Sequence, residues 1–126
     1  MKAVRTDAAP APVGPYSQAV VHAGVVYCSG QIPLDPETGS LVDGDIEAQT
    51  ERVISNLHAI LEAAGTSLAR VVRTTVYVTD LALFGRVNEV YARLFCGDPA
   101  PARATVQVAA LPLGAEVEID AIAALD

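Results

Sequence analysis

The fold is decided by residues 45–79, which read DIEAQTERVISNLHAILEAAGTSLARVVRTTVYVT. The first part predicts an amphipathic helix over residues 46–64, because apolar residues recur three and four positions apart. Asp45 is a suitable N-cap, and Gly65 supplies the left-handed residue that ends many helices. The second part, residues 71–79, is β-branched almost throughout and has no strongly polar face, which is typical of a central strand. The stretch therefore predicts a helix that packs on a sheet.

Further elements are expected on both sides of this stretch. They are a hairpin of strands at 18–22 and 25–29 joined by Ala23-Gly24, a turn-rich loop at 31–44, a second helix capped by Asp80 with a buried stripe from Phe84 to Phe95, and strands at 103–108 and 117–123. The resulting order, β-β-α-β-α-β-β, predicts an α+β fold with both helices on one face of a single sheet.

Length and composition fit one globular domain over residues 1–126. The chain is 52% hydrophobic and only 18% charged, yet no apolar run reaches the ~18 residues of a membrane span. This composition predicts an apolar surface, and residues 71–79 also have an apolar second face. Both features predict a homo-oligomer in which sheets pack against each other.

The formal net charge of −7 disfavours nucleic acid as a partner, because the seven arginines are scattered and form no basic patch. The one lysine, Lys2, lies where the terminus is expected to fray, which argues against Schiff-base chemistry.

Cys28 and Cys96 form no metal or redox motif, and the first ten residues lack the apolar region of a secretory signal. We therefore expect free thiols and a cytoplasmic location.

Several reaction classes lack their motifs. His22 and His58 have no partner at metal-ligand spacing, so no metal site is expected. The sequence contains no G-x-S-x-G elbow, P-loop or G-x-G-x-x-G fingerprint. Cys28 can be read as a nucleophile or as a buried strand thiol, and its position in a β-rich run favours the second interpretation.

Two charged residues are candidates for chemistry. Arg103 opens a strand after a proline-rich loop, where its planar guanidinium suits the capture of a small carboxylate; an ion pair with an acidic side chain is the alternative. Glu118 lies on one face of the last predicted strand and can hold a water or act as a general base. The alternative is a solvated strand face, and the spacing alone favours this second interpretation of Glu118.

Four further residues are weaker candidates. Tyr16 follows a Gly-Pro turn, Ser29 and Gly30 end a strand with a hydroxyl and an accessible N–H, and Asn88 is an amide within a buried helical stripe. From spacing alone, these residues indicate at most a pocket for a small anion near Arg103.

The same residues carry a resemblance to a known family. The matching blocks are Gly14-Pro15-Tyr16-Ser17-Gln18, Ser29-Gly30-Gln31-Ile32-Pro33, Val87-Asn88-Glu89-Val90-Tyr91, and Pro101-Ala102-Arg103-Ala104-Thr105-Val106-Gln107-Val108-Ala109-Ala110-Leu111 followed five residues later by Val117-Glu118-Ile119. Over nearly the whole chain, the sequence resembles the Rid family (reactive intermediate deaminases), also called the YjgF/YER057c/UK114 family.

The resemblance implies a chorismate-mutase-like α+β fold, assembled as a homotrimer with ligand sites between subunits. It implies cofactor-independent hydrolysis of 2-imino acids, such as 2-iminopropanoate and 2-iminobutanoate, to 2-oxo acids and ammonia. Such imines escape from pyridoxal-phosphate enzymes and damage other proteins, so the implied role is metabolite damage control.

The resemblance also implies a role for each candidate. Arg103 would hold the substrate carboxylate, Glu118 would position the attacking water, and Tyr16 would line the site with them. Ser29, Gly30 and Asn88 would line and shape it. Thr105 stands where many relatives have cysteine, so only its backbone N–H is expected to serve the ligand, and no thiol role applies.

Two other functions stay open. The family also carries the description of an endoribonuclease or translation inhibitor, which the net charge disfavours. A non-catalytic module that binds a small carboxylate would use Arg103 in the same way. Glu118 separates this module from an enzyme, because only an enzyme needs the base.

Overall fold

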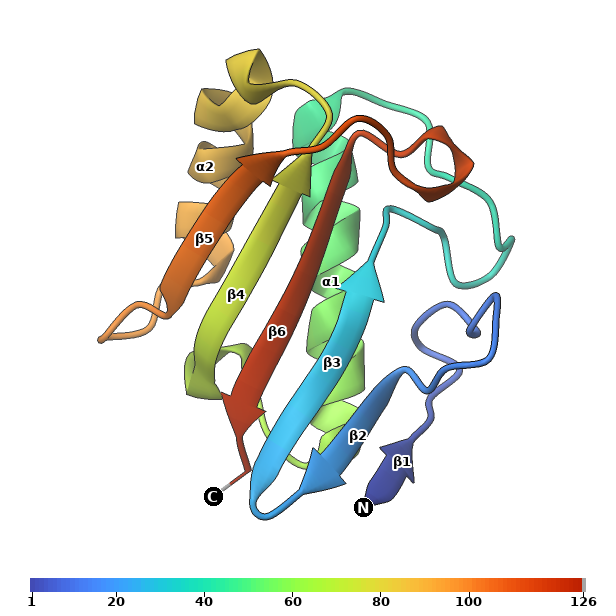
Figure 1. The fold of residues 1–126 in the computed structure, drawn as a ribbon, viewed down its shortest axis with the longest axis vertical. Helices are drawn as coiled ribbons and strands as arrows, with labels where there is room; N and C mark the ends of the chain where they lie inside the picture. The colour runs from blue at the N-terminus through green and yellow to red at the C-terminus, as the bar shows by residue number, and fades with distance from the viewer. Residues whose placement is uncertain (126) are drawn as a thin grey trace.

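The computed structural model describes residues 1–125. Six strands form one sheet in the order β1-β2-β3-β6-β4-β5, and both α-helices lie behind it in Figure 1. The elements are β1 (Lys2–Val4), β2 (Ala19–His22), β3 (Val25–Gln31), α1 (Ile46–Ala64), β4 (Val71–Val78), α2 (Phe84–Leu94), β5 (Ala102–Gln107) and β6 (Val117–Ala124), with short 3₁₀ helices η1 (Leu68–Arg70), η2 (Leu81–Leu83) and η3 (Pro112–Gly114). The predicted α+β class, with its helices on one face, is confirmed.

Helix α1 has the bounds and both caps that the sequence predicts. Asp45 Oδ1 accepts a hydrogen bond from the Ala48 N–H at 2.9 Å, and Gly65 has a φ of 93°. The apolar stripe of α1 is at most 1% exposed; it comprises Val53, Ile54, Leu57, Ile60 and Leu61. Each such side chain contributes about 1.5–3 kcal/mol through burial, so α1 and the sheet face beneath it form the core.

Strand β6 is the centre of the sheet, antiparallel to β3 on one side and to β4 on the other. Its residues alternate: Val117, Ile119, Ala121 and Ala123 are buried against the helices, whereas Glu118, Asp120 and Ile122 lie on the opposite face. Strand β5 pairs with β4 in parallel, and α2 provides the crossover that a parallel pair requires.

The structure differs from the sequence prediction at two places. Lys2 does not fray: residues 2–4 form β1, which pairs with β2, and a strand this short shows no period in sequence. Asp80 caps η2 instead of α2, because its Oδ1 accepts from the Ala82 N–H at 2.9 Å and α2 begins only at Phe84.

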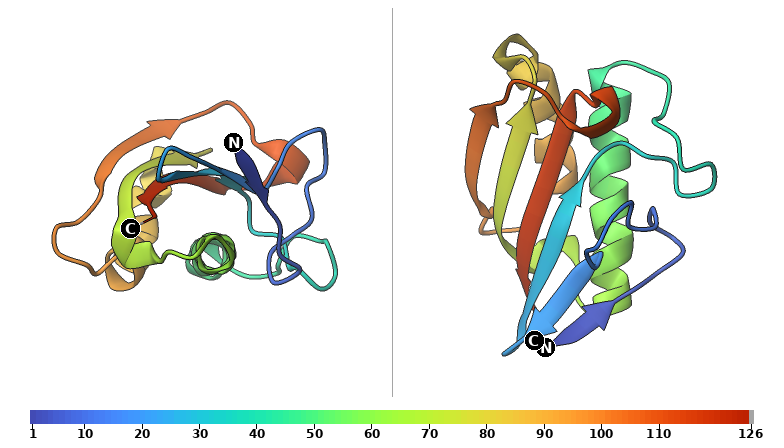
Figure 2. Two further views of the ribbon diagram at one scale, coloured as in Figure 1. Left: turned by 90° about the horizontal axis from the view of Figure 1, so that it is seen from below. Right: turned by 45° about the vertical axis from the view of Figure 1, so that its right-hand side comes forward.

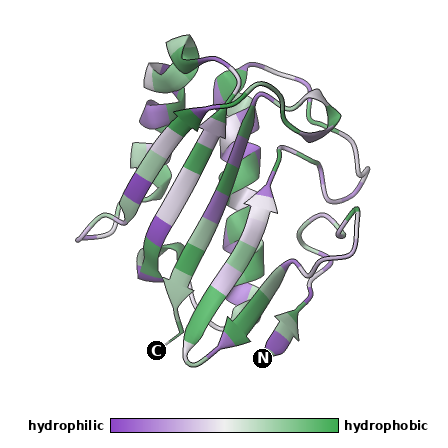
Figure 3. Cartoon of the chain, in the orientation of Figure 1, coloured by the Kyte–Doolittle hydropathy of each residue, from purple (hydrophilic) through white to green (hydrophobic). Residues whose placement is uncertain are grey.

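The face of the sheet opposite the helices is open (Figure 2). Tyr27 of β3 is 44% exposed there and Val106 of β5 is 41% exposed. In Figure 3, hydrophobic and hydrophilic residues alternate along β6, whose hydrophobic Val117, Ile119, Ala121 and Ala123 are buried against the helices. The exposed Tyr27 and Val106 on this uncovered face are the surface on which the predicted self-association depends. Within residues 1–125, no helix is long and apolar enough to cross a membrane.

Candidate functional site

Arg103 lies near the start of β5, on the side of the sheet that the helices cover. Its Nη1 donates to Asn88 Oδ1 of α2 at 2.7 Å, and its guanidinium carbon lies 4.7 Å from the centroid of the Tyr91 ring and 5.3 Å from that of Phe84. These contacts fix the orientation of the guanidinium plane. No carboxylate of residues 1–125 pairs with Arg103, so the predicted alternative of an internal ion pair is not supported, and the charge remains available to an external anion.

Thr105 lies two residues further along β5, opposite Val76. Its Oγ1 is buried and has no hydrogen-bond partner within residues 1–125. The Val108 N–H donates to the Val78 carbonyl of β4. Successive N–H groups along a strand point to opposite edges of that strand. The N–H groups of Arg103 and Thr105 therefore point away from β4, to the open edge of the sheet. The guanidinium and these N–H groups therefore all lie at the edge strand, where an anion can reach them.

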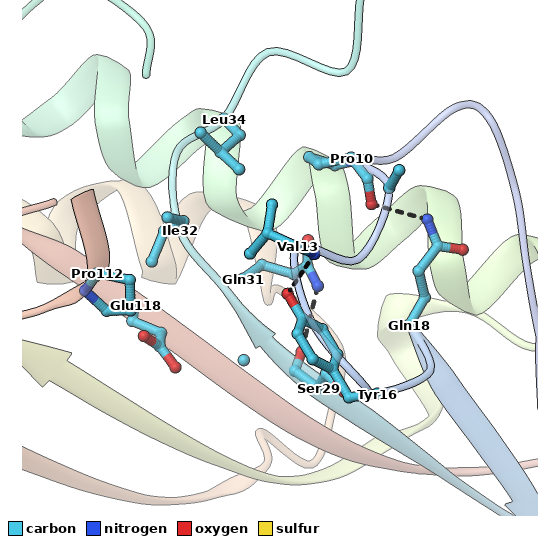
Figure 4. A pocket seen from close by; sticks show the side chains of 12 residues that line it. Pro10, Val13, Tyr16, Gln18, Ser29, Gln31, Ile32, Leu34, Pro112 and Glu118 are labelled. Atoms are coloured by element: carbon cyan, nitrogen blue, oxygen red, sulfur yellow. Dashed lines mark hydrogen bonds between the residues drawn. The ribbon is translucent and has the colours of Figure 1, made fainter. Parts of the chain in front are cut away.

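A cavity of about 360 Å³ lies where β3 ends and β6 begins (Figure 4). It brings together four of the sequence-predicted residues, Tyr16, Ser29, Gly30 and Glu118. Its apolar lining includes Pro10, Val13, Ile32, Leu34 and Pro112. Arg103, Asn88 and Thr105 do not line it. The cavity thus combines a carboxylate and two hydroxyls with an apolar wall.

Glu118 extends across Gly30 of the neighbouring strand. A Cβ on Gly30 would lie 2.9 Å from Glu118 Cδ and 3.2 Å from Cγ, so only glycine leaves room for this carboxylate. The pairing of β3 with β6 shifts register between Cys28 and Gln31, which displaces Gly30 from the regular ladder. Burial, and secondarily the charge of Asp120, raises the pKa of Glu118 above its usual range. The raised pKa makes this carboxylate a stronger base.

Asp120 follows on the same face of β6 and is held by two donors. Its Oδ1 accepts from the Thr75 N–H at 3.2 Å and its Oδ2 accepts from the Tyr77 hydroxyl at 3.1 Å. Burial and this hydrogen bond raise the pKa of Tyr77. These two hydrogen bonds hold the Asp120 carboxylate on the same face of the strand as Glu118.

Ser29 and Tyr16 are fixed by the segment that precedes β2. The Ser29 hydroxyl donates to the Ser17 carbonyl at 2.6 Å, which ties the end of β3 to this segment. The Tyr16 hydroxyl accepts from the Val13 N–H at 3.2 Å, and Tyr16 remains about half exposed at the rim of the cavity. Their hydroxyls are thus positioned by main-chain groups.

One chain does not assemble all the predicted residues at one place. Arg103 pairs with Thr74 of β4 and faces the helices, whereas Glu118 pairs with Tyr77 of β4 on the open face. Their Cα positions also lie two strands apart, at ~5 Å per strand, and three residues apart along the strands, at ~3.3 Å per residue. The pocket around Arg103 that residue spacing suggests is therefore not formed by residues 1–125 of a single chain.

The remaining sequence candidates have structural explanations. Burial, and secondarily the charge of Asp120, raises the pKa of Cys28 to about 12, so Cys28 is a protonated core thiol and not a nucleophile. His58 Nε2 lies 3.2 Å from Glu62 Oε1 on the surface of α1. Within the described residues, no three His, Cys, Asp or Glu side chains gather closely enough to hold a metal ion.

Three residues that line or flank the cavity carry little sign of it in the sequence. Gln18 closes the first matching block, and its amide is buried beside the cavity. Pro112 comes from a loop between strands, and Asp120 looks like one more exposed acid of an alternating strand. Only Gln18 could have been found from its motif, because the other two depend on how loops and strands meet.

The fold and these two groups of residues define a small α+β protein with a cavity beside Glu118 and a separate arginine at its edge strand. The chain belongs to the Endoribonuclease L-PSP family, which it matches over residues 6–125 and which is the Rid family that the sequence predicts. Protein DfrA of Myxococcus xanthus is 60% identical over 97% of this chain and 94% of its own length. The 2-iminobutanoate/2-iminopropanoate deaminase of Mus musculus is 50% identical over 97% of this chain and 90% of its own.

Solved structures share the fold closely. RidA from an Antarctic Psychrobacter species superposes with a TM-score of 0.94 at 51% identity, covering 98% of this chain and 99% of that one. TdcF of Escherichia coli, crystallised with bound serine, has a TM-score of 0.93 at 41% identity and covers 98% of both chains. Both likenesses extend over the strands and loops that carry the two groups of residues described above.

Proposed function

We propose that the protein is a 2-imino acid deaminase that acts as a homotrimer, with each site built by two subunits. One subunit supplies the β5 edge with Arg103, and its neighbour supplies the cavity with Glu118. The separation of these residues within one chain carries the proposal, because neither region alone holds both a cation and a base. The open sheet face with Tyr27 is the surface through which subunits pack.

The proposed substrates are 2-iminopropanoate and 2-iminobutanoate, which are hydrolysed to 2-oxo acids and ammonia. The name of the mouse relative supports this choice. The serine bound to TdcF also supports it, since serine has a carboxylate and a nitrogen on the adjacent carbon, as these imines do. The proposed role is metabolite damage control in the cytoplasm, where the free thiols Cys28 and Cys96 stay reduced.

In the proposed reaction, Arg103 binds the substrate carboxylate through two N–H groups, and Asn88 keeps the guanidinium oriented. The ionised Glu118 accepts a proton from water, the water oxygen bonds to C2, and the C=N electron pair moves to nitrogen. The nitrogen then takes the proton from Glu118 and becomes an amine. As the C–N bond breaks, Glu118 takes the proton of the new hydroxyl and passes it to the departing nitrogen, so that nitrogen leaves as ammonia and Glu118 is again ionised. The products are ammonia and the C=O group of the 2-oxo acid.

The imine is already electrophilic, so this chemistry needs only orientation, a water and a base. Tyr16 and Ser29 line the neighbour's half of the site, and Gly30 makes room for Glu118. The Thr105 N–H at the open edge of β5 is a second donor for the carboxylate beside Arg103. No cofactor takes part in the proposed steps.

The test is the release of ammonia and 2-oxo acid from the two imines generated in situ. Wild type should exceed a protein-free blank, and Arg103→Ala should fall to that blank. Arg93→Ala is the matched control, because Arg93 is an exposed arginine that pairs with Glu51 of α1. Full turnover in Arg103→Ala, or no acceleration by wild type, contradicts the proposal.

Glu118→Gln distinguishes the enzyme from a binding module. The amide keeps the shape of the side chain but removes the base, so turnover should fall ~100-fold or more while the affinity for 2-oxobutanoate changes little. A binding module would bind 2-oxobutanoate in the same way and show no wild-type turnover.

A further inference from the structure

The segment between Thr6 and Tyr16 is anchored by a buried amide, Gln18. Its side chain is 2% exposed, and its Oε1 accepts from the Thr6 N–H at 2.7 Å. Its Nε2 donates to the carbonyls of Thr6 at 3.0 Å and Pro10 at 2.9 Å, and lies 3.4 Å from that of Ala9. Figure 4 shows Gln18 reaching Pro10 beside the cavity. One carboxamide thus satisfies main-chain groups at both ends of Thr6–Pro10.

Only an amide satisfies these groups, because they include one donor and several acceptors. A carboxylate at this position could accept from Thr6 but would present oxygen to the Pro10 carbonyl. An apolar side chain would leave both main-chain groups unpaired in a buried place. The chemistry of Gln18 is therefore matched to holding this segment.

The anchored segment forms one side of the cavity. Pro10, Ala11 and Val13 line it on the side that Gln18 secures. Ile32 and Leu34 also line it, and their carbonyls accept from Asn56 Nδ2 at 3.4 and 3.0 Å. One part of the apolar lining is thus held by helix α1, and the other is held by Gln18.

We propose that Gln18 is a positioning residue that sets the side-chain preference of the site, by holding residues 10–13 where they contact the aliphatic side chain of the substrate. The inference rests on the proposed function and adds the element that determines specificity. A cavity of about 360 Å³ falls within the size range of ordinary ligand pockets, so it has room for side chains longer than ethyl. The contacts to such side chains depend on the placement of residues 10–13.

The test compares two imines in the same variant. The ratio of kcat/KM for 2-imino-4-methylpentanoate to that for 2-iminopropanoate should fall ~10-fold in Gln18→Met and Gln18→Glu. This ratio does not depend on how much of the protein is folded, so a merely structural role leaves it unchanged. Val13→Ala should lower the ratio in the same direction, and Val13 is 68% exposed, so this variant keeps its fold.

Thr66→Val is the matched control. It removes a hydrogen bond of 2.6 Å from the Thr66 hydroxyl to the Ala124 carbonyl, away from the cavity, and should leave the ratio unchanged. An unchanged ratio in Gln18→Glu and Val13→Ala overturns the inference, while wild-type turnover would still support the proposed function. If the wild type turns over neither imine, the proposed function fails. The side-chain preference is then measured as the ratio of the affinities for 4-methyl-2-oxopentanoate and 2-oxopropanoate.

Discussion

Asn88 accepts a hydrogen bond of 2.7 Å from Arg103, and this bond joins α2 to the edge strand β5. The acceptor is a neutral amide oxygen, so it orients the guanidinium without neutralising its charge. A carboxylate at the same position would hold Arg103 equally well but would compete with an incoming anion.

We therefore expect Asn88→Asp to weaken substrate binding more than Asn88→Ala does. The KM for 2-iminobutanoate and the Kd for 2-oxobutanoate should rise ~10-fold or more in Asn88→Asp, because a fixed carboxylate pairs with Arg103. Steady-state kinetics and calorimetry measure the two values. Equal values for the two variants would mean that the neutrality of Asn88 is unimportant.

Gly30→Ala should remove the base from its place. The added Cβ would collide with the Glu118 carboxylate, so the side chain must turn away, and kcat should fall ~10-fold or more while the assembly persists. Light scattering and kinetics measure the two effects.

Gly85→Ala is the control for this substitution, since a Cβ on Gly85 meets no atom within 4 Å. Its kcat should equal that of wild type. A Gly30→Ala protein with wild-type kcat would show that Glu118 tolerates displacement or does not act as the base.

Asp120→Asn should shift the acid side of the pH profile. Activity requires ionised Glu118, so it falls as the pH drops through the raised pKa of that residue. Removing the charge of Asp120 lowers the pKa of Glu118, and the fall in kcat/KM should move to lower pH. Burial, the larger cause, remains, so part of the elevation persists. A profile that is unchanged or moves to higher pH contradicts the coupling.

Mixing two inactive variants should restore activity if each site uses two subunits. Arg103→Ala and Glu118→Gln each spoil a different half of the site, so hybrid trimers contain some interfaces with both halves intact. After joint refolding of equal amounts, about a quarter of the interfaces should be complete. Recovery is measured as ammonia release and compared with each variant refolded alone. A mixture as inactive as its components would place both residues in a site of one subunit.

Weak RNA binding is expected despite the name of the family. The net charge is −7, and Arg86 and Arg93 are paired with Glu47 and Glu51. Retention on immobilised RNA should vanish at about 0.3 M salt, because few phosphates can be neutralised. Binding that survives this salt concentration would reopen the ribonuclease interpretation.

The sequence by itself determined the elements whose signals are local. The caps Asp45 and Gly65 and the spacing of apolar residues between them set helix α1, and Ala23-Gly24 set the first hairpin with positive φ at both residues. The motif blocks also name Tyr16, Ser29, Gly30 and Glu118, and these four residues meet at one cavity.

Only the tertiary structure decided how these residues are divided. Strand β6 enters between β3 and β4, which places Glu118 over Gly30 on the open face, while Arg103 faces α2 two strands away. Strand neighbours and register are set by pairing between distant segments, and a shift of one residue exchanges the two faces of a strand. Local periodicity therefore fixes which residues alternate along β5 and β6, and long-range packing fixes which face and which neighbour each of them meets.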